Sequence, residues 1–373
     1  MNTLEKNQSR IEYLDLLRVL ACFMVLFIHA GDPFLFDGTT NTFNPYTSFL
    51  VAFLRPSVPL FIMISAVLLL PIKQTRTEFI KRRFKRVGIP FLVWSILYVF
   101  LPIPSKIIFG GPTNLFTDSG MNVYLYNLMM IPINFTGSNV HFWFIYTILG
   151  LYLTMPILSP WIKQAELSDI KYFLILWVIT LFFPYIKIWF PQILGECDWN
   201  DFGMLFYFGG YLGYVILAYY LHHHNKMSFK KSFSIGIIAF AIGLAFTYQG
   251  FLYDCNRFLE ALHQGNEDWK ILELCIGNLT PNVVLMTVGV YLMFQKLSLS
   301  NNASKWVTTL SKRSYGIFLV HYILNLWIAP IIASNLSINE GIEQLLVTLI
   351  VFTIANVIVW LLSYIPKSRY IIG

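Results

Sequence analysis

Three ionisable residues, Asp15, Arg18 and His29, lie in the first long apolar stretch of the chain. On a helix, Arg18 and His29 lie within about 20° of one face and about 16 Å apart along the axis, because they are eleven positions apart. Asp15 joins this face about one turn before Arg18. Ionisable groups inside a membrane helix are costly and usually functional, and a histidine among them is an acid–base candidate. The structural alternative is a buried Asp15–Arg18 pair with His29 capping the helix end.

A basic run follows the second apolar stretch, with seven Lys or Arg residues and one acid between Lys73 and Arg86. Arg82, Arg83 and Arg86 come immediately before the third apolar stretch. Guanidinium groups bind phosphate in bidentate geometry, so the run indicates a phosphate-rich cofactor at the inner mouth of the protein. A contact with anionic lipid that only sets the topology is the simpler alternative.

Four further residues are candidates because of where they lie in apolar stretches. His141 and Trp143 lie at the outer end of the fourth stretch, His321 lies well inside the ninth, and Arg55 lies in the second beside a proline. Trp143 alone is expected in an interfacial aromatic belt. His321 suits a proton relay or a ligand contact, and equally a hydrogen-bonded packing role. We place Arg55, Trp143 and His321 on the substrate path.

The composition indicates that this protein lies in a lipid bilayer. Of the 373 residues, 57% are hydrophobic and only 12% are charged, which is too apolar for a soluble protein of this size. The sequence therefore predicts an all-α integral membrane protein, a single transmembrane domain over residues 1–373 with a bundle of about ten helices. The predicted spans are 13–30, 48–70, 89–109, 142–159, 171–190, 202–221, 233–250, 279–297, 314–333 and 345–365.

The distribution of Lys and Arg predicts the orientation. With these spans, the side away from the N-terminus carries only Lys106, Lys187, Arg257 and Lys270. By the positive-inside rule both termini are cytoplasmic and the number of spans is even. No cleavable signal peptide is expected, because the first stretch carries charges and further spans follow it.

Some segments are ambiguous. Residues 122–134 are apolar but short, so they suit a re-entrant or interfacial piece, and 251–278 is predicted as a long outer loop. The histidines at 222–224 are expected in a solvated loop. Cys255 and Cys275 could form a disulfide that closes the outer loop. The alternative is that Cys197, Cys255 and Cys275 are three unpaired thiols.

The chain resembles acyltransferase family 3, whose members acylate bacterial surface and secreted polysaccharides. The matching pieces are Arg10, Tyr13, Asp15, Leu17, Arg18 and His29, VPLFIMIS at 58–65, Arg83 and Arg86 before Pro90, HFWF at 141–144, and SYGIFLVH at 314–321. Val19 and Ala66 stand where members often have glycine, which puts local helix packing in doubt.

The resemblance implies an acyl-CoA donor, most often acetyl-CoA, and a hydroxyl of an extracytoplasmic or lipid-linked carbohydrate as acceptor. It implies a bacterial cytoplasmic membrane as location, with the lipid bilayer as partner and with neither a metal nor nucleic acid. The oligomeric state stays open, a homo-oligomer included.

The residues and the resemblance together suggest roles. His29 is the general base, His141 or a backbone donor stabilises the oxyanion, and Asp15 orients Arg18. Arg18, Arg82, Arg83 and Arg86 bind the donor. The alternatives are an acyl-enzyme on His29, a secondary transporter, and a polysaccharide export partner without acyl transfer.

Overall fold

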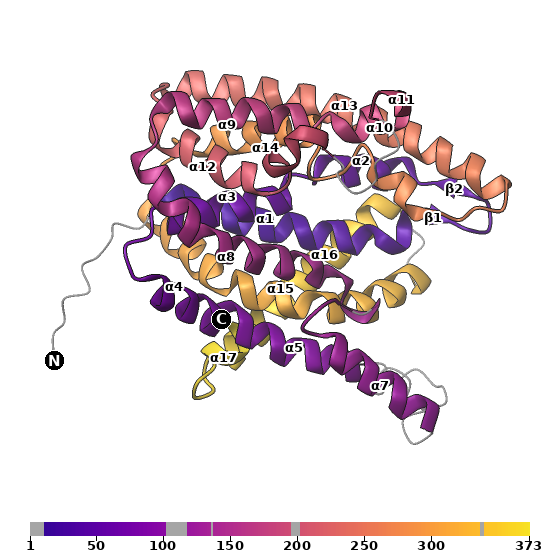
Figure 1. The fold of residues 1–373 in the computed structure, drawn as a ribbon. Helices are drawn as coiled ribbons and strands as arrows, with labels where there is room; N and C mark the ends of the chain where they lie inside the picture. The colour runs from indigo at the N-terminus through magenta and orange to yellow at the C-terminus, as the bar shows by residue number, and fades with distance from the viewer. Residues whose placement is uncertain (1–10, 102–117, 136, 195–201, 336–338) are drawn as a thin grey trace. The chain divides into compact units, whose positions relative to one another are not determined.

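The computed structural model describes residues 11–101, 118–135, 137–194, 202–335 and 339–373, and it is almost entirely helical over these ranges (Figure 1). The helices are α1 (Glu12–Gly31), α2 (Pro45–Phe53), α3 (Ser57–Leu69), α4 (Arg76–Arg83), α5 (Ile89–Phe100), α7 (Asp118–Met130), α8 (Trp143–Gln164), α9 (Leu167–Thr180), α10 (Phe183–Trp189), α11 (Pro191–Leu194), α12 (Leu212–His224), α13 (Phe229–His263), α14 (Pro281–Phe294), α15 (Asn301–Asn335), α16 (Glu340–Leu362) and α17 (Arg369–Ile372). Two short strands, β1 (Phe36–Asp37) and β2 (Thr42–Phe43), form an antiparallel hairpin.

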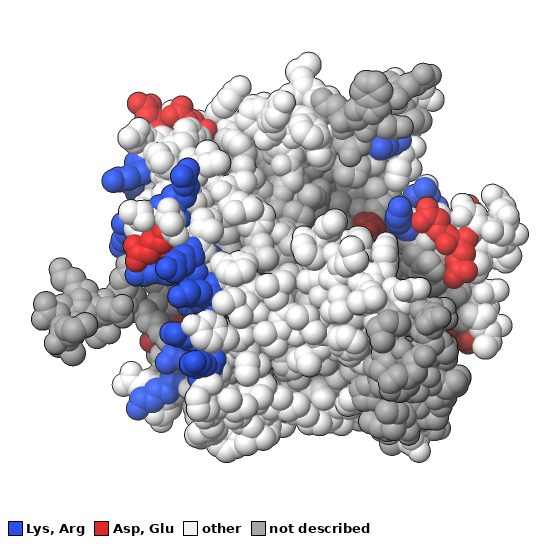
Figure 2. All heavy atoms as spheres, turned by 60° about the horizontal axis from the view of Figure 1, so that its bottom comes forward, with Lys and Arg blue, Asp and Glu red and all other residues white. Residues whose placement is uncertain are grey.

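Among the described residues, seven helical stretches are long and apolar enough to cross a bilayer, and α14 is a shorter apolar helix. Broad areas of the visible face carry no Lys, Arg, Asp or Glu (Figure 2), as expected of a surface that faces lipid. The all-α membrane class is therefore confirmed. The number of ten spans and the side of each terminus stay predictions.

The predicted spans are mostly helical where the structure describes them, but several bounds were wrong. Residues 102–109 of the predicted span 89–109 lie outside the described residues. The 202–221 span divides into a 3₁₀ helix (Gly203–Phe208) and α12, because Gly210 has a positive φ of 87°. α13 has 35 residues and continues to His263, so the predicted outer loop begins later than residue 251. At 1.5 Å per residue this helix is about 52 Å long, which exceeds a hydrocarbon core of about 30 Å. Segment 122–134 is mostly the short helix α7.

The described chain divides into two compact units. Unit 1 contains Met1–Leu68, Glu166–Ser314 and Ala329–Thr348, and unit 2 contains Leu69–Ala165, Tyr315–Ile328 and Leu349–Gly373. Whether both act as the one domain expected from the sequence stays a prediction.

Contacts at the start of α1 define one end of unit 1. The Tyr13 hydroxyl lies 2.6 Å from His222 Nδ1 and 3.0 Å from the Tyr291 hydroxyl, so the last turns of α12 and α14 meet α1 here. The Ser304 hydroxyl of α15 donates to Glu12. His222 thus belongs to a helix and is partly buried, and the expectation of a solvated histidine loop was wrong for this residue.

The opposite end of unit 1 contains the hairpin that follows α1. The Phe36 ring packs edge-on against Phe258 and Trp269, both at 5.7 Å between centroids. Thr39 and Thr40 donate hydrogen bonds to the Asp37 carboxylate, and these bonds fix the tip of the hairpin. The same bonds, first from Thr39 and then from Thr40, lower the pKa of Asp37 to about 2.

Cys255 and Cys275 are buried free thiols, so the disulfide alternative does not hold in this structure. Burial raises the pKa of the Cys275 thiol to about 12, and its backbone N–H donates to Asp254. Cys197 lies outside the described residues.

Glycines allow α13 and α14 to pack closely side by side (Figure 1). A Cβ atom on Gly289 would lie 2.6 Å from the Phe240 nitrogen and 2.7 Å from the Gly236 oxygen. Both atoms belong to the backbone, so the helices would have to separate. Close approach through small residues is a main source of helix association in membranes, where lipid is as apolar as the helix surfaces.

We predict that Gly289→Ala lowers the thermal unfolding temperature in detergent, because overpacking of this kind costs about 1–3 kcal/mol. Gly150→Ala is the matched control, since a Cβ atom added there would meet nothing within 4 Å. Scanning fluorimetry of both variants would measure the difference. Equal unfolding temperatures for the two variants would contradict close backbone packing of α13 on α14.

Candidate active site

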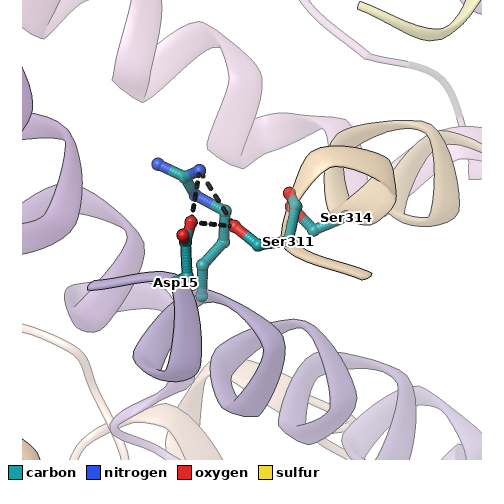
Figure 3. A network of polar contacts seen from close by, with 4 residues as sticks. Asp15, Ser311 and Ser314 are labelled. Atoms are coloured by element: carbon teal, nitrogen blue, oxygen red, sulfur yellow. Dashed lines mark hydrogen bonds and ion pairs between the residues drawn. The ribbon is translucent and has the colours of Figure 1, made fainter. Parts of the chain in front are cut away.

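The start of α1 carries a buried polar network, shown in Figure 3. The Ser311 hydroxyl, which reaches from α15 toward α1, donates to Asp15 Oδ1 at 2.6 Å. Arg18 NH1 donates to the same hydroxyl at 3.2 Å and lies 3.8 Å from Asp15 Oδ1. The predicted Asp15–Arg18 pair therefore exists, and Ser311 bridges it.

Other bonds hold this network in place. The Ser314 hydroxyl donates to the Ser311 carbonyl within α15, and the Cys22 thiol lies 3.6 Å from the Ser314 carbonyl oxygen. Asp15 is only 6% exposed, so its carboxylate depends on these partners for its hydrogen bonds. Ser311 was not predicted as a site residue, although it lies three residues before the SYGIFLVH motif.

His29 lies in the last turn of α1, and its Nδ1 atom is 3.1 Å from Asp32 Oδ2. Asp32 begins a short 3₁₀ turn (Asp32–Phe34) in which Pro33 fixes the backbone. A proton on Nδ1 that is donated to Asp32 places the imidazole lone pair on Nε2. The carboxylate also stabilises the imidazolium that forms when Nε2 accepts a proton. This is the arrangement of an oriented general base.

Asp32 is a second residue that was not predicted as part of the site. The i, i+3 spacing from His29 could have identified it, since residues three apart face each other on a helix. The histidine side chain is 19% exposed and the carboxylate 53%, so the pair is accessible from outside the protein.

Arg55 lies in the turn between α2 and α3, where Pro56 interrupts the helix. The carboxylates of Glu273 and Asp32 act on its guanidinium electrostatically. Its Nε atom is buried and has no hydrogen-bond partner among the described residues. Arg55 and Asp32 therefore belong to one charged region of unit 1, which also contains His29.

His141 and His321 lie together in unit 2. His141 ends a 3₁₀ turn (Gly137–Phe142) before α8, and its ring is 5.1 Å from the His321 ring and 4.7 Å from the Tyr322 ring. His321 Nδ1 is 2.6 Å from the Phe318 carbonyl oxygen, one turn earlier in α15. Both histidines are almost completely buried. Trp143 begins α8, and its ring lies 6.2 Å from that of Phe144.

Tyr98 connects this pair to α5 and α15. Its hydroxyl donates to the Leu319 carbonyl at 3.0 Å and accepts from the Ile323 N–H at 3.2 Å, and its ring lies 5.2 Å from His141. The packing is tight and aromatic, so a structural role for His141 and His321 is as well supported as a chemical one.

A basic pocket of about 380 Å³ lies in unit 2 and is lined by Arg82, Arg83, Lys85, Arg86, Arg369 and Gly373. The backbone between α4 and α5 is a π-helical turn (Phe84–Gly88), and such turns are frequent at functional sites. The volume is within the usual range of about 300–1,000 Å³ for ligand sites. Three of the four arginines predicted to bind the donor, Arg82, Arg83 and Arg86, therefore line one pocket, together with Lys85 and Arg369. Arg18, the fourth, is not among the lining residues.

The pocket holds like charges at close range. The Arg83 guanidinium lies 5.9 Å from the Phe79 ring centroid, and its Nε atom is buried without a hydrogen-bond partner among the described residues. Burial lowers the pKa of Arg83, and the neighbouring Arg86 and Arg82 lower it further, against an opposite effect of Tyr152. An anionic ligand would relieve both the repulsion and the missing hydrogen bond.

The C-terminal residues Arg369 and Gly373 also line this pocket. The Trp94 indole N–H donates to the Ile371 carbonyl at 2.8 Å, which holds α17 on α5. The Arg369 guanidinium stacks 4.9 Å above the Tyr370 ring. Arg369 was not predicted to line this pocket, because no local pattern connects it to the run at 73–86.

The comparisons with known proteins gave one match. A family model described as an acyltransferase domain matches residues 11–365, nearly the whole chain. No curated protein and no solved structure matches the sequence.

We predict that Ser311→Ala lowers the unfolding temperature, because it leaves the buried Asp15 carboxylate short of one hydrogen bond, a loss of about 1–3 kcal/mol. Thr309→Ala is the matched control on the same helix, since its exposed hydroxyl bonds only the Lys305 carbonyl in the described contacts. Thermal unfolding of both variants in detergent is the measurement. If Ser311→Ala unfolds no earlier than Thr309→Ala, the bridge contributes nothing to stability.

Proposed function

Because this chain belongs to the acyltransferase family whose model covers residues 11–365, we propose that it is a carbohydrate O-acyltransferase. It takes an acyl group, acetyl in the first instance, from acyl-CoA and transfers it to a hydroxyl of an extracytoplasmic or lipid-linked carbohydrate. The observation that carries this proposal is the His29–Asp32 pair at the end of α1.

In the proposed reaction, His29 Nε2 takes the proton of the acceptor hydroxyl as its oxygen attacks the thioester carbonyl carbon. The tetrahedral intermediate then breaks its carbon–sulfur bond. The leaving thiolate receives the proton from the His29 imidazolium and departs as CoA, while the acyl group stays on the sugar oxygen as an ester. Asp32 keeps the imidazole oriented throughout and stabilises its charged form.

The basic pocket of unit 2 is the proposed site for the phosphates of the donor. CoA carries a pyrophosphate and a ribose phosphate, and the guanidinium groups of Arg82, Arg83, Arg86 and Arg369 match such oxygens in geometry and charge. The Asp15–Arg18–Ser311 network has a positioning role in this proposal, because Arg18 already bonds Ser311 and pairs with Asp15.

The protein is a multi-pass membrane protein, and we propose the bacterial cytoplasmic membrane as its location. The positive-inside distribution of Lys and Arg then puts the run at 73–86 in the cytoplasm, where acyl-CoA is made. The family match favours acyl transfer over the transporter and export-partner alternatives.

We predict that His29→Ala lowers kcat for acyl transfer by about 10²–10⁴-fold, the usual contribution of a general base. Asp32→Asn should lower kcat by about tenfold or more, since it removes the charge that stabilises the imidazolium. The measurement is transfer of radiolabelled acetyl from acetyl-CoA to carbohydrate in membranes that contain equal amounts of folded protein.

Asp37→Asn is the matched control, because Asp37 is an acid of the neighbouring hairpin that bonds Thr39 and Thr40 and has no role in the proposed reaction. It should keep parental activity. Full activity of His29→Ala would exclude His29 as the base, and loss of activity in Asp37→Asn as well would indicate a general effect of charge at this end.

We also predict that the Arg83→Ala, Arg86→Ala double variant binds acetyl-CoA at least about tenfold more weakly, since hydrogen bonds to charged groups contribute about 1.5–3 kcal/mol each. Calorimetry on the detergent-purified protein is the measurement. An Arg76→Ala, Lys81→Ala double variant removes the same charge from the same segment outside the pocket and should bind like the parent. Equal weakening of acetyl-CoA binding in both variants would mean that the pocket acts only as a nonspecific basic surface.

A further inference from the structure

Arg55 is a cation of unit 1 that the proposed reaction does not yet use. It lies in the candidate membrane span Pro45–Leu69, in the turn between α2 and α3 that contains Pro56. A charged group inside such a segment is costly and usually functional. Its buried Nε atom has no hydrogen-bond partner among the described residues, although the residue as a whole is partly exposed. The guanidinium group therefore retains capacity to donate a hydrogen bond.

Arg55 differs from two other arginines of unit 1 in its lack of a direct ion pair. Arg18 lies 3.8 Å from Asp15 Oδ1, and Arg257 lies 3.7 Å from Asp254 Oδ1. For Arg55, the part of the chain that the structure describes contains no carboxylate oxygen within 4 Å. Its positive charge is therefore not neutralised by a carboxylate in direct contact.

A small apolar core connects the segment that carries Arg55 with the segment that carries Asp32. Three segments of unit 1 pack in this core through Leu35, Val51 and Leu272. Asp32 comes three residues before Leu35, Arg55 follows Val51 by about one helical turn, and Glu273 is the neighbour of Leu272. The carboxylates of Glu273 and Asp32 consequently act on the Arg55 guanidinium electrostatically.

The proposed reaction creates a negative charge in this region. When the acceptor oxygen attacks the thioester, the carbonyl oxygen becomes an oxyanion while His29 takes up the proton. The side chain of Asp32 is 53% exposed and Glu273 is also exposed, so both carboxylates would repel an oxyanion that forms beside His29. Arg55 is a cation on which both of these carboxylates act, so its charge can balance that repulsion.

We propose that Arg55 is a further catalytic residue, whose guanidinium group donates hydrogen bonds to the oxyanion of the tetrahedral intermediate. The inference rests on the proposed function, because it assigns a residue to that reaction. The negative charge appears as the new carbon–oxygen bond forms and disappears as the carbon–sulfur bond breaks, so Arg55 exchanges no proton. His141, the candidate from the sequence, belongs to unit 2, whereas Arg55 belongs to the same unit as His29. A preorganised donor is most effective where water is excluded, as within a membrane segment.

The first test compares the kinetics of Arg55→Ala with its binding of acetyl-CoA. The variant should lower kcat for transfer of radiolabelled acetyl to carbohydrate in membranes by about 10²–10³-fold, the usual effect of removing one oxyanion donor. The Kd for acetyl-CoA, measured by calorimetry, should stay at the parental value, because the oxyanion exists only after attack. Lys270→Ala is the matched control, since it removes an exposed positive charge from the turn that contains Glu273 and should keep the parental kcat.

A double variant distinguishes direct contact with the oxyanion from an indirect effect through Asp32. If Arg55 acts on the oxyanion itself, Arg55→Ala should lower kcat by the same factor in the Asp32→Asn protein as in the parent. If Arg55 only positions or neutralises Asp32, the substitution should have no further effect once that carboxylate is gone. The second result would make Arg55 a positioning residue and overturn the proposal.

Arg55→Gln keeps a polar side chain and replaces Arg55→Ala if that variant does not fold. Parental kcat in the folded variant would overturn the proposal, and so would an acetyl-CoA Kd weakened by the same factor as kcat, because Arg55 would then bind the donor before the reaction. The proposed function fails separately. An inactive parent protein would remove both proposals, whereas an active parent, an inactive His29→Ala and a fully active Arg55→Ala would remove only the role of Arg55.

Discussion

The cost of an unsatisfied polar group in hydrocarbon is the constraint on which the rest of this structure depends. A membrane helix has no water to solvate a carboxylate or a guanidinium, so each such group needs a partner from the protein. The buried Asp15 carboxylate obtains one hydrogen bond from Ser311, a residue that lies far along the chain. The same requirement explains why Arg18 lies beside Asp15 and donates to Ser311.

The sequence predicted well what depends on local pattern. Hydropathy located the helices, and the 3.6-residue period put Arg18 and His29 on one face of α1. The run before α5 indicated the arginines that line the basic pocket. Helix ends were predicted less well, because hydropathy reports the thickness of the bilayer, whereas α13 continues as a regular helix to His263. Its last turns stay helical because Phe251, Cys255 and Phe258 bury one face in a local core.

The partners of the predicted residues could not be found in the same way. Ser311 and Arg369 reach their sites only through tertiary structure, and a serine or an arginine near a helix end carries no signal of a distant contact. Asp32 is different, since it lies one turn from His29 and local spacing was sufficient to identify it. Arg55 was predicted from its cost of burial alone, and the structure adds the carboxylates of Asp32 and Glu273 as the charges that act on it.

His29 and His321 are both held through Nδ1 by an oxygen atom one turn away, but the two oxygen atoms differ in charge. In each, Nδ1 lies within hydrogen-bond distance of an oxygen one turn away, a carboxylate for His29 and the Phe318 carbonyl for His321. A base must become an imidazolium, and a carboxylate stabilises that charge more strongly than a neutral carbonyl does. His321 is completely buried among aromatic rings, where a new positive charge would lose its hydration. The partly exposed His29 is therefore the better base, and His321 is better suited to hold a neutral ring in place.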